Sequence, residues 1–129
     1  MEPRRLRPVV FDSSFLMAVA EHPTAWFGDI QQSIGAFRPV ILASVRAELM
    51  RLAASGDKRA SIASVALLLV QANRFSSERD GGGSPDDEVI SFALRERAGV
   101  ATIDSDLAKR LRASKVEPVI TLRAGRVHS

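Results

Sequence analysis

The stretch PVVFDSS at residues 8–14 decides the fold class of this chain. Its first four residues form an apolar run without polar alternation, which is typical of a strand that is buried on both faces. Asp12 ends the run, and Ser13 and Ser14 belong to the residue types that cap a following helix. A buried strand at 8–11 is therefore predicted to pass directly into a helix at 15–20.

The same alternation of short apolar runs and helical segments continues to the end of the chain. Further strands are predicted at 40–42, 100–103 and 118–122, with a short edge strand at 74–78. Helices are predicted at 24–37, 44–55, 58–72, 84–98 and 105–113. The segment 58–72 is apolar on nearly every side, which indicates a buried helix, and Gly99 is expected to end the helix at 84–98. Strands that alternate with helices and lack polar alternation predict a parallel sheet covered on both faces, in a single domain over residues 1–129.

The composition removes several classes of chemistry. The chain has 129 residues, of which 46% are apolar and 26% are charged, with no cysteine and only two histidines. The lack of cysteine excludes disulfide frameworks, thiolate zinc sites and cysteine nucleophiles, and two histidines disfavour a histidine-rich metal site. The chemistry is therefore expected to come from carboxylates, hydroxyls and guanidinium groups.

No segment of the sequence is predicted to cross a membrane. Apolar runs such as residues 65–70 are far shorter than the roughly 20 residues that a spanning helix needs. Arginines followed by an apolar stretch near the N-terminus imitate a secretory signal, but Asp12 interrupts the would-be hydrophobic region. We therefore expect a cytoplasmic protein without a targeting segment.

Several acids are placed where a parallel sheet binds its ligands, which is beyond the carboxyl ends of the strands. Asp12 follows the first strand, Asp104 follows the strand at 100–103, and Asp86 and Asp87 open the helix that leads to that strand. These acids are predicted to converge in space, although helix capping is the alternative for each of them. The helical projection places Asp86 on the inward side and makes Asp87 the capping-box residue.

Glu48 is harder to explain as a surface residue. It lies on the shoulder of the apolar stripe of its helix, where an unpaired charge costs several kcal/mol. A salt bridge to Arg46 or Arg51 is the structural alternative to a functional role. In contrast, Glu88 and Asp106 are expected to point toward solvent.

Carboxylates that gather at one point repel one another, and a hard divalent cation resolves that repulsion. Oxygen-only ligands suit Mg²⁺ or Mn²⁺. Such ions activate water and stabilise the charge that develops on a phosphate oxygen, and this chemistry needs neither histidine nor cysteine.

Short motifs along the chain, taken in order, resemble those of a PIN domain. They are VVFDSS at 9–14, EL at 48–49, DDEVI at 86–90 and ATIDSDL at 101–107. The resemblance covers nearly the whole chain, and its end at 118–123 resembles a small archaeal-type subgroup that is related to PIN nucleases of ribosomal RNA processing. VapC toxins share the same acidic set. The resemblance implies a three-layer α/β/α fold and a metal-dependent ribonuclease that leaves a 5′-phosphate and a 3′-hydroxyl.

The resemblance also implies roles for individual residues. The acidic quartet that holds the metal and carries catalysis maps onto Asp12, Glu48, Asp86 and Asp104. Asp87 and Asp106 match additional acids of the related subgroup, and Ser14 and Thr102 match supporting hydroxyl residues. Ile103 departs from the asparagine or arginine that is frequent at its position, which removes an accessory polar contact.

The resemblance leaves two roles open for such an enzyme. It is a VapC-type toxin, which implies a cognate antitoxin as partner, or an RNA-maturation nuclease. A homodimer is a further candidate assembly. The alternative from another class is a non-catalytic PIN-like module that binds RNA or assists ribosome assembly.

The net charge of +3 hides an uneven distribution of basic residues. The residues predicted to contact RNA phosphates lie near the two chain ends, namely Arg4, Arg5, Arg7, Lys109, Arg110 and Arg112. A solvated helix face and tails are the alternative for these residues.

Two other features have less specific predictions. Trp26, Phe27 and Phe37 are expected to lie in the core or to form an apolar dimer patch. The glycine run at 81–83 lacks the lysine of a phosphate-binding loop and is expected to form a mobile flap beside the acidic site.

Overall fold

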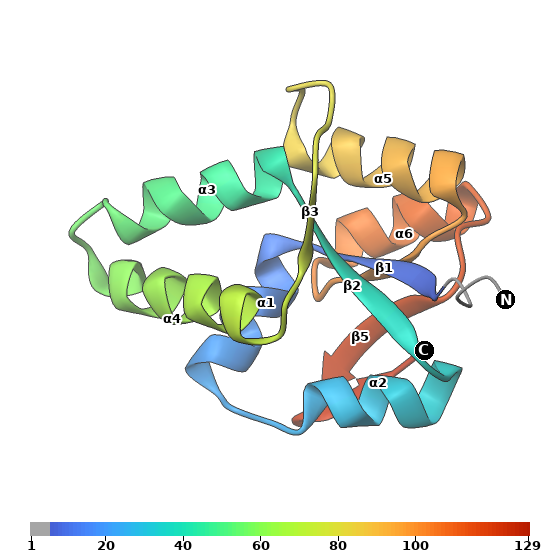
Figure 1. Cartoon of the computed structure of the whole chain (residues 1–129), viewed down its shortest axis with the longest axis horizontal. Coiled ribbons are helices and arrows are strands. Elements are labelled where there is room, and N and C mark those ends of the chain that lie inside the picture. Colours follow the sequence, from blue (N-terminus) through green and yellow to red (C-terminus); the bar gives the residue numbers. More distant parts are fainter. Residues whose placement is uncertain (1–5) are drawn as a thin grey trace, which may run out of the picture.

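The strands form one sheet in the order β3-β2-β1-β4-β5-β6 (Figure 1). The structure is a computed structural model that describes residues 6–129. Its strands are β1 (Arg7–Phe11), β2 (Phe37–Leu42), β3 (Ser76–Glu78), β4 (Gly99–Ala101), β5 (Val119–Arg123) and β6 (Arg126–His128). Neighbouring strands are parallel except for the β5–β6 pair. The predicted mostly parallel sheet is confirmed.

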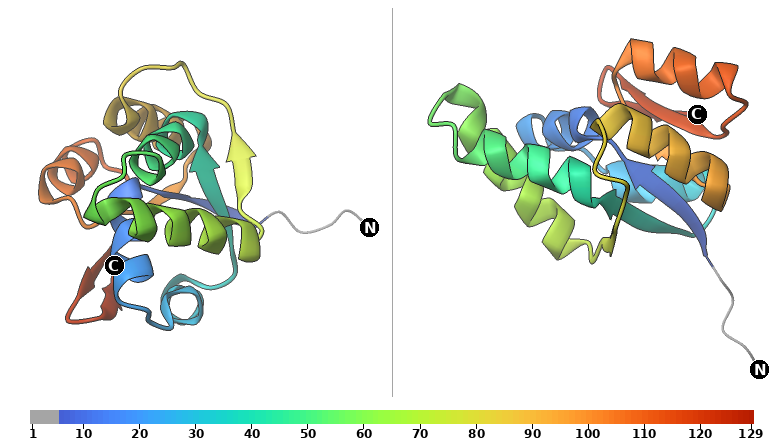
Figure 2. Two further views of the ribbon diagram at one scale, coloured as in Figure 1. Left: turned by 90° about the vertical axis from the view of Figure 1, so that its left-hand side faces the viewer. Right: turned by 90° about the horizontal axis from the view of Figure 1, so that it is seen from above.

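Helices cover both faces of this sheet (Figure 2). They are α1 (Ser13–Glu21), α2 (Trp26–Ile34), α3 (Ala43–Ala53), α4 (Lys58–Ala72), α5 (Pro85–Glu96) and α6 (Ser105–Ala113). Right-handed crossovers place α5 and α6 on one face, and α1, α2 and α4 on the other. The result is the three-layer α/β/α arrangement that the sequence predicts.

The central strand β1 forms the middle of the hydrophobic core. Val9, Val10 and Phe11 are fully buried, because β2 and β4 pair with β1 on its two sides and helices cover both faces. The Phe11 ring lies 5.4 Å from that of Phe15 and 5.5 Å from that of Trp26, measured between centroids. Edge-to-face pairs of this kind stabilise beyond the area that they bury.

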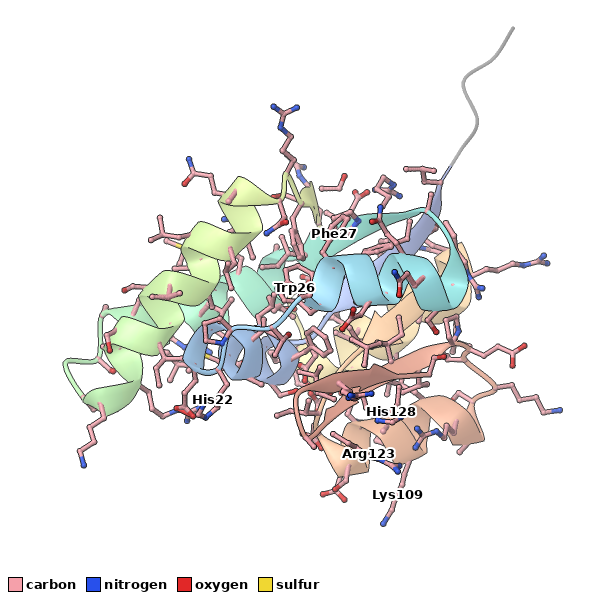
Figure 3. All side chains as sticks on the ribbon, turned by 90° about the horizontal axis from the view of Figure 1, so that it is seen from below. His22, Trp26, Phe27, Lys109, Arg123 and His128 are labelled. Carbon is pink, nitrogen blue, oxygen red and sulfur yellow. The ribbon has the colours of Figure 1, made fainter. Side chains whose placement is uncertain are left out.

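The aromatic residues Trp26 and Phe37 belong to this core and not to a dimer patch. Trp26 is 5% exposed and Phe37 is 3% exposed, while Phe27 is partly buried against the same cluster (Figure 3). The prediction of a core role is therefore confirmed for Trp26 and Phe37.

Two predicted helix ends are wrong. The helix predicted at 24–37 ends at Ile34, because Gly35 has a left-handed φ of 86° and Phe37 already begins β2. The helix predicted to end at Gly99 ends at Glu96, and Gly99 lies in β4. A Cβ atom on Gly99 would come within 3.1 Å of the Pro118 ring, so a close approach between β4 and β5 requires glycine there.

The prediction that the helix at 58–72 is buried is also wrong. Only one side of α4 is buried, through Ala63, Ala66 and Val70. Leu68 on its outer side is 62% exposed. The apolar surface of α4 is larger than the area that α1 and α3 can cover. A high content of apolar residues in a helix therefore overestimates its burial.

The final hairpin contains a strand, β6, that was not predicted from the sequence. Ala124 and Gly125 both have positive φ, of 50° and 76°, between the paired residues Arg123 and Arg126. Two such residues turn the chain back as a tight hairpin, and Asn-Gly or Asp-Gly is the usual signal for it. Among residues 6–129, no helix is both long and apolar enough to cross a membrane.

Candidate active site

The carboxylates of the predicted quartet come from four separate elements. Asp12 follows β1, Glu48 lies on α3, Asp86 lies in the first turn of α5, and Asp104 precedes α6. β1 and β4 are parallel neighbours, so the residues that follow them emerge at the same edge of the sheet. The fold therefore directs residues that are distant in sequence toward one edge.

Asp12 is held by a hydrogen-bond network and does not cap α1. It occupies the N-cap position of α1 without a side-chain capping bond. Its Oδ2 atom accepts hydrogen bonds from Ser14 Oγ at 2.5 Å and from Thr102 Oγ1 at 2.8 Å. These contacts favour the functional interpretation of Asp12 over the capping one.

Backbone amides set the direction of both hydroxyls. Ser14 Oγ accepts a hydrogen bond from the Ile103 amide, and Thr102 Oγ1 accepts one from the Asp104 amide, each at 3.0 Å. A hydroxyl carries a single proton, so each is left to donate that proton to Asp12. Since Asp12 is only 4% exposed, this network fixes the orientation of its carboxylate.

Asp104 combines a capping role with a place at the site. Its Oδ1 atom accepts hydrogen bonds from the amides of Asp106 and Leu107, at 2.9 and 3.0 Å. Within residues 6–129, no hydrogen bond engages the Oδ2 atom of Asp104. The capping interpretation is confirmed for one oxygen, and the second oxygen stays available to a ligand.

Glu48 forms a contact that differs from the salt bridge considered as the structural alternative. Its Oε1 atom accepts a hydrogen bond from Ser13 Oγ at 2.5 Å, and none of the ion pairs within residues 6–129 involves it. The salt bridge to Arg46 or Arg51 is therefore wrong. The contact joins α3 to the start of α1, next to Asp12.

The other three members of the quartet affect the pKa of Asp86. Burial raises the pKa of the Asp86 carboxyl, and the negative charges of Asp12, Asp104 and Glu48 raise it further against the opposing effect of Arg110. A carboxyl whose pKa rises beside like charges is a mark of functional sites. Asp86 therefore lies within electrostatic reach of Asp12, Asp104 and Glu48.

Asp87 points away from the cluster toward a basic partner. Ser84 Oγ accepts a hydrogen bond from the Asp87 amide at 3.4 Å, as the predicted helix start requires. The Asp87 carboxylate accepts a hydrogen bond from Arg110 at 2.7 Å, so the predicted capping-box role of that carboxylate is wrong. This hydrogen bond is the main cause that lowers the pKa of Asp87. Asp106 is exposed at the start of α6.

The glycine loop is tied to neighbouring elements, in contrast to the predicted mobile flap. The Gly81 amide donates to Glu88 Oε1 at 2.6 Å, and the Gly82 amide donates to Asp80 Oδ1 at 3.0 Å. Asp80 Oδ2 in turn accepts from the Ser44 amide at the start of α3. Glu88 was expected to point to solvent, but loop amides need acceptors and recruit it.

The donor types at this edge suit a hard divalent cation. The quartet supplies carboxylate oxygens, and Ser13, Ser14 and Thr102 supply hydroxyl oxygens, which are the kind of ligand that Mg²⁺ and Mn²⁺ prefer. As the side chains stand in residues 6–129, no group of three acids or histidines is close enough to hold a metal ion. The acids are therefore connected through their effect on Asp86 and not through a shared coordination geometry.

A family model for a PIN like domain matches residues 9–125 of the chain. The chain belongs to the PIN-like domain family. Among curated protein sequences, none matches it.

Solved structures support the same fold for this PIN-like domain. The PIN domain endonuclease Utp24 is similar with a TM-score of 0.78 and 22% identity, over 93% of this chain and 88% of that one. A domain of a functionally unknown protein from Methanocaldococcus jannaschii DSM 2661 has a TM-score of 0.68 and 15% identity, over 95% of this chain and 96% of that one. The VapBC2 structure from Rickettsia felis, bound to a DNA fragment from their promoter, has a TM-score of 0.66 and 14% identity, over 90% and 99%.

The basic residues predicted to bind RNA occupy different parts of the PIN-like domain. Arg4 and Arg5 lie outside the described residues. Arg7 begins β1, at the opposite edge of the sheet from Asp12, and donates a hydrogen bond to the carbonyl of Glu117. Arg110 pairs with Asp87 beside the carboxylates. Lys109 and Arg112 line a groove that also contains Asp104.

Two residues of this site were missed by sequence reasoning. Ser13 contacts Glu48, which lies 35 residues away, and Asp80 contacts Ser44, which lies 36 residues away. Neither pairing has a local sequence signal, because only the packing of α1, α3 and the loop before α5 brings these atoms together.

The raised pKa of Asp86 predicts that Asp86→Asn stabilises the metal-free protein at neutral pH, by a few degrees Celsius in the unfolding temperature. The unfolded chain loses this proton near pH ~3.9, while the folded protein keeps it to a higher pH. Stability therefore falls as pH rises between the two values, and asparagine removes that loss. Thermal unfolding in EDTA measures it.

The increase in unfolding temperature should be fully present at pH 7. It should vanish in acid, because Asp86 of the wild type is then protonated in both the folded and the unfolded protein. Asp106→Asn serves as the matched control, because Asp106 is exposed and its substitution should leave the unfolding temperature unchanged. A lower unfolding temperature for Asp86→Asn at pH 7 would show that its charge is compensated in the folded protein.

Proposed function

We propose that this PIN-like domain is an endoribonuclease that hydrolyses RNA phosphodiester bonds with Mg²⁺ or Mn²⁺. The observation that carries the proposal is the placement of Asp12 and Asp104 directly after the neighbouring parallel strands β1 and β4, near Asp86 and Glu48. Burial and the charges of Asp12, Asp104 and Glu48 raise the pKa of Asp86 at this edge of the sheet. Such an arrangement costs stability and is typical of a site that a cation completes.

Three of the four quartet members are oriented by partners within the protein. Asp12, Glu48, Asp86 and Asp104 would hold the metal. The metal, when bound, lowers the pKa of a water molecule and stabilises charge on a phosphate oxygen. Ser14 and Thr102 orient the Asp12 carboxylate, Ser13 orients that of Glu48, and the α6 amides orient that of Asp104. The carboxylates of Asp12, Glu48 and Asp104 are thereby oriented by partners within the protein.

Two solved relatives favour different biological roles for such a nuclease. One is described as a PIN domain endonuclease, and the other is a VapBC complex. At 22% and 14% identity, they show the shared fold only. We propose RNA cleavage in either role, as an RNA-maturation nuclease or as a toxin with a cognate antitoxin. An adjacent small antitoxin gene would favour the toxin, whereas unprocessed ribosomal RNA after deletion would favour maturation.

The decisive experiment is incubation of the protein with structured and single-stranded RNA in Mg²⁺, Mn²⁺ or EDTA. We expect cleavage with either metal, no cleavage in EDTA, and products with 5′-phosphate and 3′-hydroxyl ends. Cleavage that persists in EDTA would contradict the metal-dependent mechanism. Binding of RNA without cleavage under every condition would favour the non-catalytic module.

Thr102→Val should lower the affinity of the site for its metal, so that cleavage requires a higher Mn²⁺ concentration. Thr102 is fully buried, and valine keeps its shape while removing the hydroxyl that donates to Asp12. Loss of a residue that orients a metal ligand typically lowers metal affinity by about 10–100-fold. The measurement is the Mn²⁺ concentration that gives half-maximal cleavage, which should rise by that factor.

Thr102→Ser is the matched control, because serine retains the hydroxyl and loses only a methyl group. It should keep the metal dependence of the wild type. If valine and serine shift the half-maximal concentration equally, the hydroxyl does not orient Asp12 for metal binding.

A further inference from the structure

A groove of about 240 Å³ begins at Asp104 and runs between α6 and β5. Lys109 and Arg112 line it from α6, and Arg123 lines it from the carboxyl end of β5. Figure 3 shows Lys109 and Arg123 on the same side of the molecule. One quartet carboxylate and three cations therefore share one depression.

A second cavity continues this groove toward the other edge of the sheet. Its volume is about 850 Å³, and Arg112 lines both the groove and the cavity. Arg7 and Lys115 add two more cations to the cavity, which Glu117 and Ser129 also line. A basic track thus leads from Asp104 along α6 to the start of β1.

The cations of the groove are available to an external anion. None of the ion pairs formed within residues 6–129 involves Lys109, Arg112 or Arg123, whereas Arg110 on the same helix is engaged by Asp87. Cations beside an acidic cluster lower the repulsion that a polyanion meets there. Among residues 6–129, no aromatic side chain lines the groove or the cavity, so phosphate contacts and not base stacking are the means of binding that these residues offer.

We propose that this track binds the sugar-phosphate backbone of single-stranded RNA that flanks the cleaved bond, with Lys109, Arg112 and Arg123 as its phosphate contacts. The proposal rests on the proposed ribonuclease function and adds the path of the substrate. A groove bounded by one helix and one strand accommodates one backbone. Contacts to phosphate carry no base information, so binding should be nearly independent of sequence.

The test measures binding of a labelled single-stranded RNA in the Asp12→Asn background, which separates binding from cleavage. The combined variant Lys109→Gln, Arg112→Gln and Arg123→Gln is compared with the matched control Lys58→Gln, Arg59→Gln and Arg74→Gln. Both remove three charges, and the control residues are exposed at or after α4. Polarisation is recorded over a series of salt concentrations.

Loss of three phosphate contacts should lower the salt slope by about 2, since each contact on a single strand contributes about 0.7. At 0.1 M salt, this slope corresponds to about 100-fold weaker binding. The control should bind like the Asp12→Asn parent. Equal weakening by both combined variants, or no weakening by the groove variant, would overturn the proposal.

The dependence of binding on RNA length tests whether the end of the track near β1 contacts RNA. Lys115→Gln should weaken binding of an RNA of about 16 nucleotides and leave binding of one of about 4 nucleotides unchanged, a range that spans the site sizes of single-strand binding folds. Tighter binding of duplex DNA than of single-stranded RNA, with the same groove dependence, would overturn the assignment to single-stranded RNA.

The two proposals fail separately. If the wild type does not cleave RNA but the groove variant still loses binding, the ribonuclease proposal fails and the track stands. If the wild type cleaves RNA with metal and the groove variant binds normally, the track fails and the ribonuclease proposal stands.

Discussion

Asp12→Asn should lower the rate of metal-dependent RNA cleavage by about 10³-fold or more. Asp12 is the quartet member with the most fixed orientation, held by Ser14 and Thr102 and buried at the end of β1. Metal ions contribute several kcal/mol of transition-state stabilisation, and each 1.36 kcal/mol is a tenfold change in rate. Asparagine keeps an oxygen that can accept both hydroxyl hydrogen bonds, so the fold should persist while a ligand charge is lost. The measurement is the initial cleavage rate in Mg²⁺ and in Mn²⁺.

Asp29→Asn is the matched control for this substitution. Asp29 lies in the first turn of α2, outside the acidic cluster, and its substitution should leave the rate unchanged. Far-ultraviolet circular dichroism and the unfolding temperature of Asp12→Asn verify that its fold is intact. A folded Asp12→Asn protein that cleaves RNA at the wild-type rate would remove the quartet from the mechanism.

Phe11→Ala should lower the free energy of unfolding by about 3–5 kcal/mol. Phe11 is fully buried, and its ring lies 4.9 Å from that of Phe75, in addition to its contacts with Phe15 and Trp26. Truncation leaves a cavity at the carboxyl end of β1 that a sheet and two helices cannot close. Since domains of this kind are stable by only about 5–15 kcal/mol, the loss is a large part of the total. Urea unfolding measures it.

Leu68→Ala is the control for Phe11→Ala, because Leu68 is mostly exposed on the outer side of α4. Its truncation should change the free energy of unfolding by no more than about 0.5 kcal/mol. If Phe11→Ala is too unstable to purify, Phe11→Leu replaces it and should cost less, in the range of about 1–3 kcal/mol. Equal effects at positions 11 and 68 would contradict the assignment of the core.

The elements that the sequence predicted well are those with strong local signals. The first strand ends at Phe11, directly before Asp12, the Ser84-Pro85 pair begins α5, and α6 spans 105–113 as predicted. Each depends on a short apolar run or a capping residue, which acts within a few residues. The helix end at Ile34 was missed although Gly35 is an ordinary stop signal, whereas the end at Glu96 was missed because Arg97 adopts a left-handed conformation that its residue type does not signal.

For the acidic residues, too, local signals predicted some features and packing decided others. Their order along the chain and their positions next to strands and helix starts were sufficient to predict that they gather at one edge. The partners of those acids depend on packing. Glu48 binds Ser13 and not a neighbouring arginine, and Asp87 pairs with Arg110, which lies 23 residues away.

The sequence by itself predicted the parallel α/β architecture, because periodicity and capping are local properties, and its resemblance to PIN domains pointed to the set of four carboxylates. The tertiary structure decided which oxygens those carboxylates present, which face of α4 is exposed, and that the cations of α6 and β5 line one groove. These features depend on contacts between residues far apart in the chain, and no local pattern encodes the distance between them. The physical reason is that side-chain partners are selected by the packing of whole helices and strands, whereas the elements themselves are selected by their nearest neighbours in sequence.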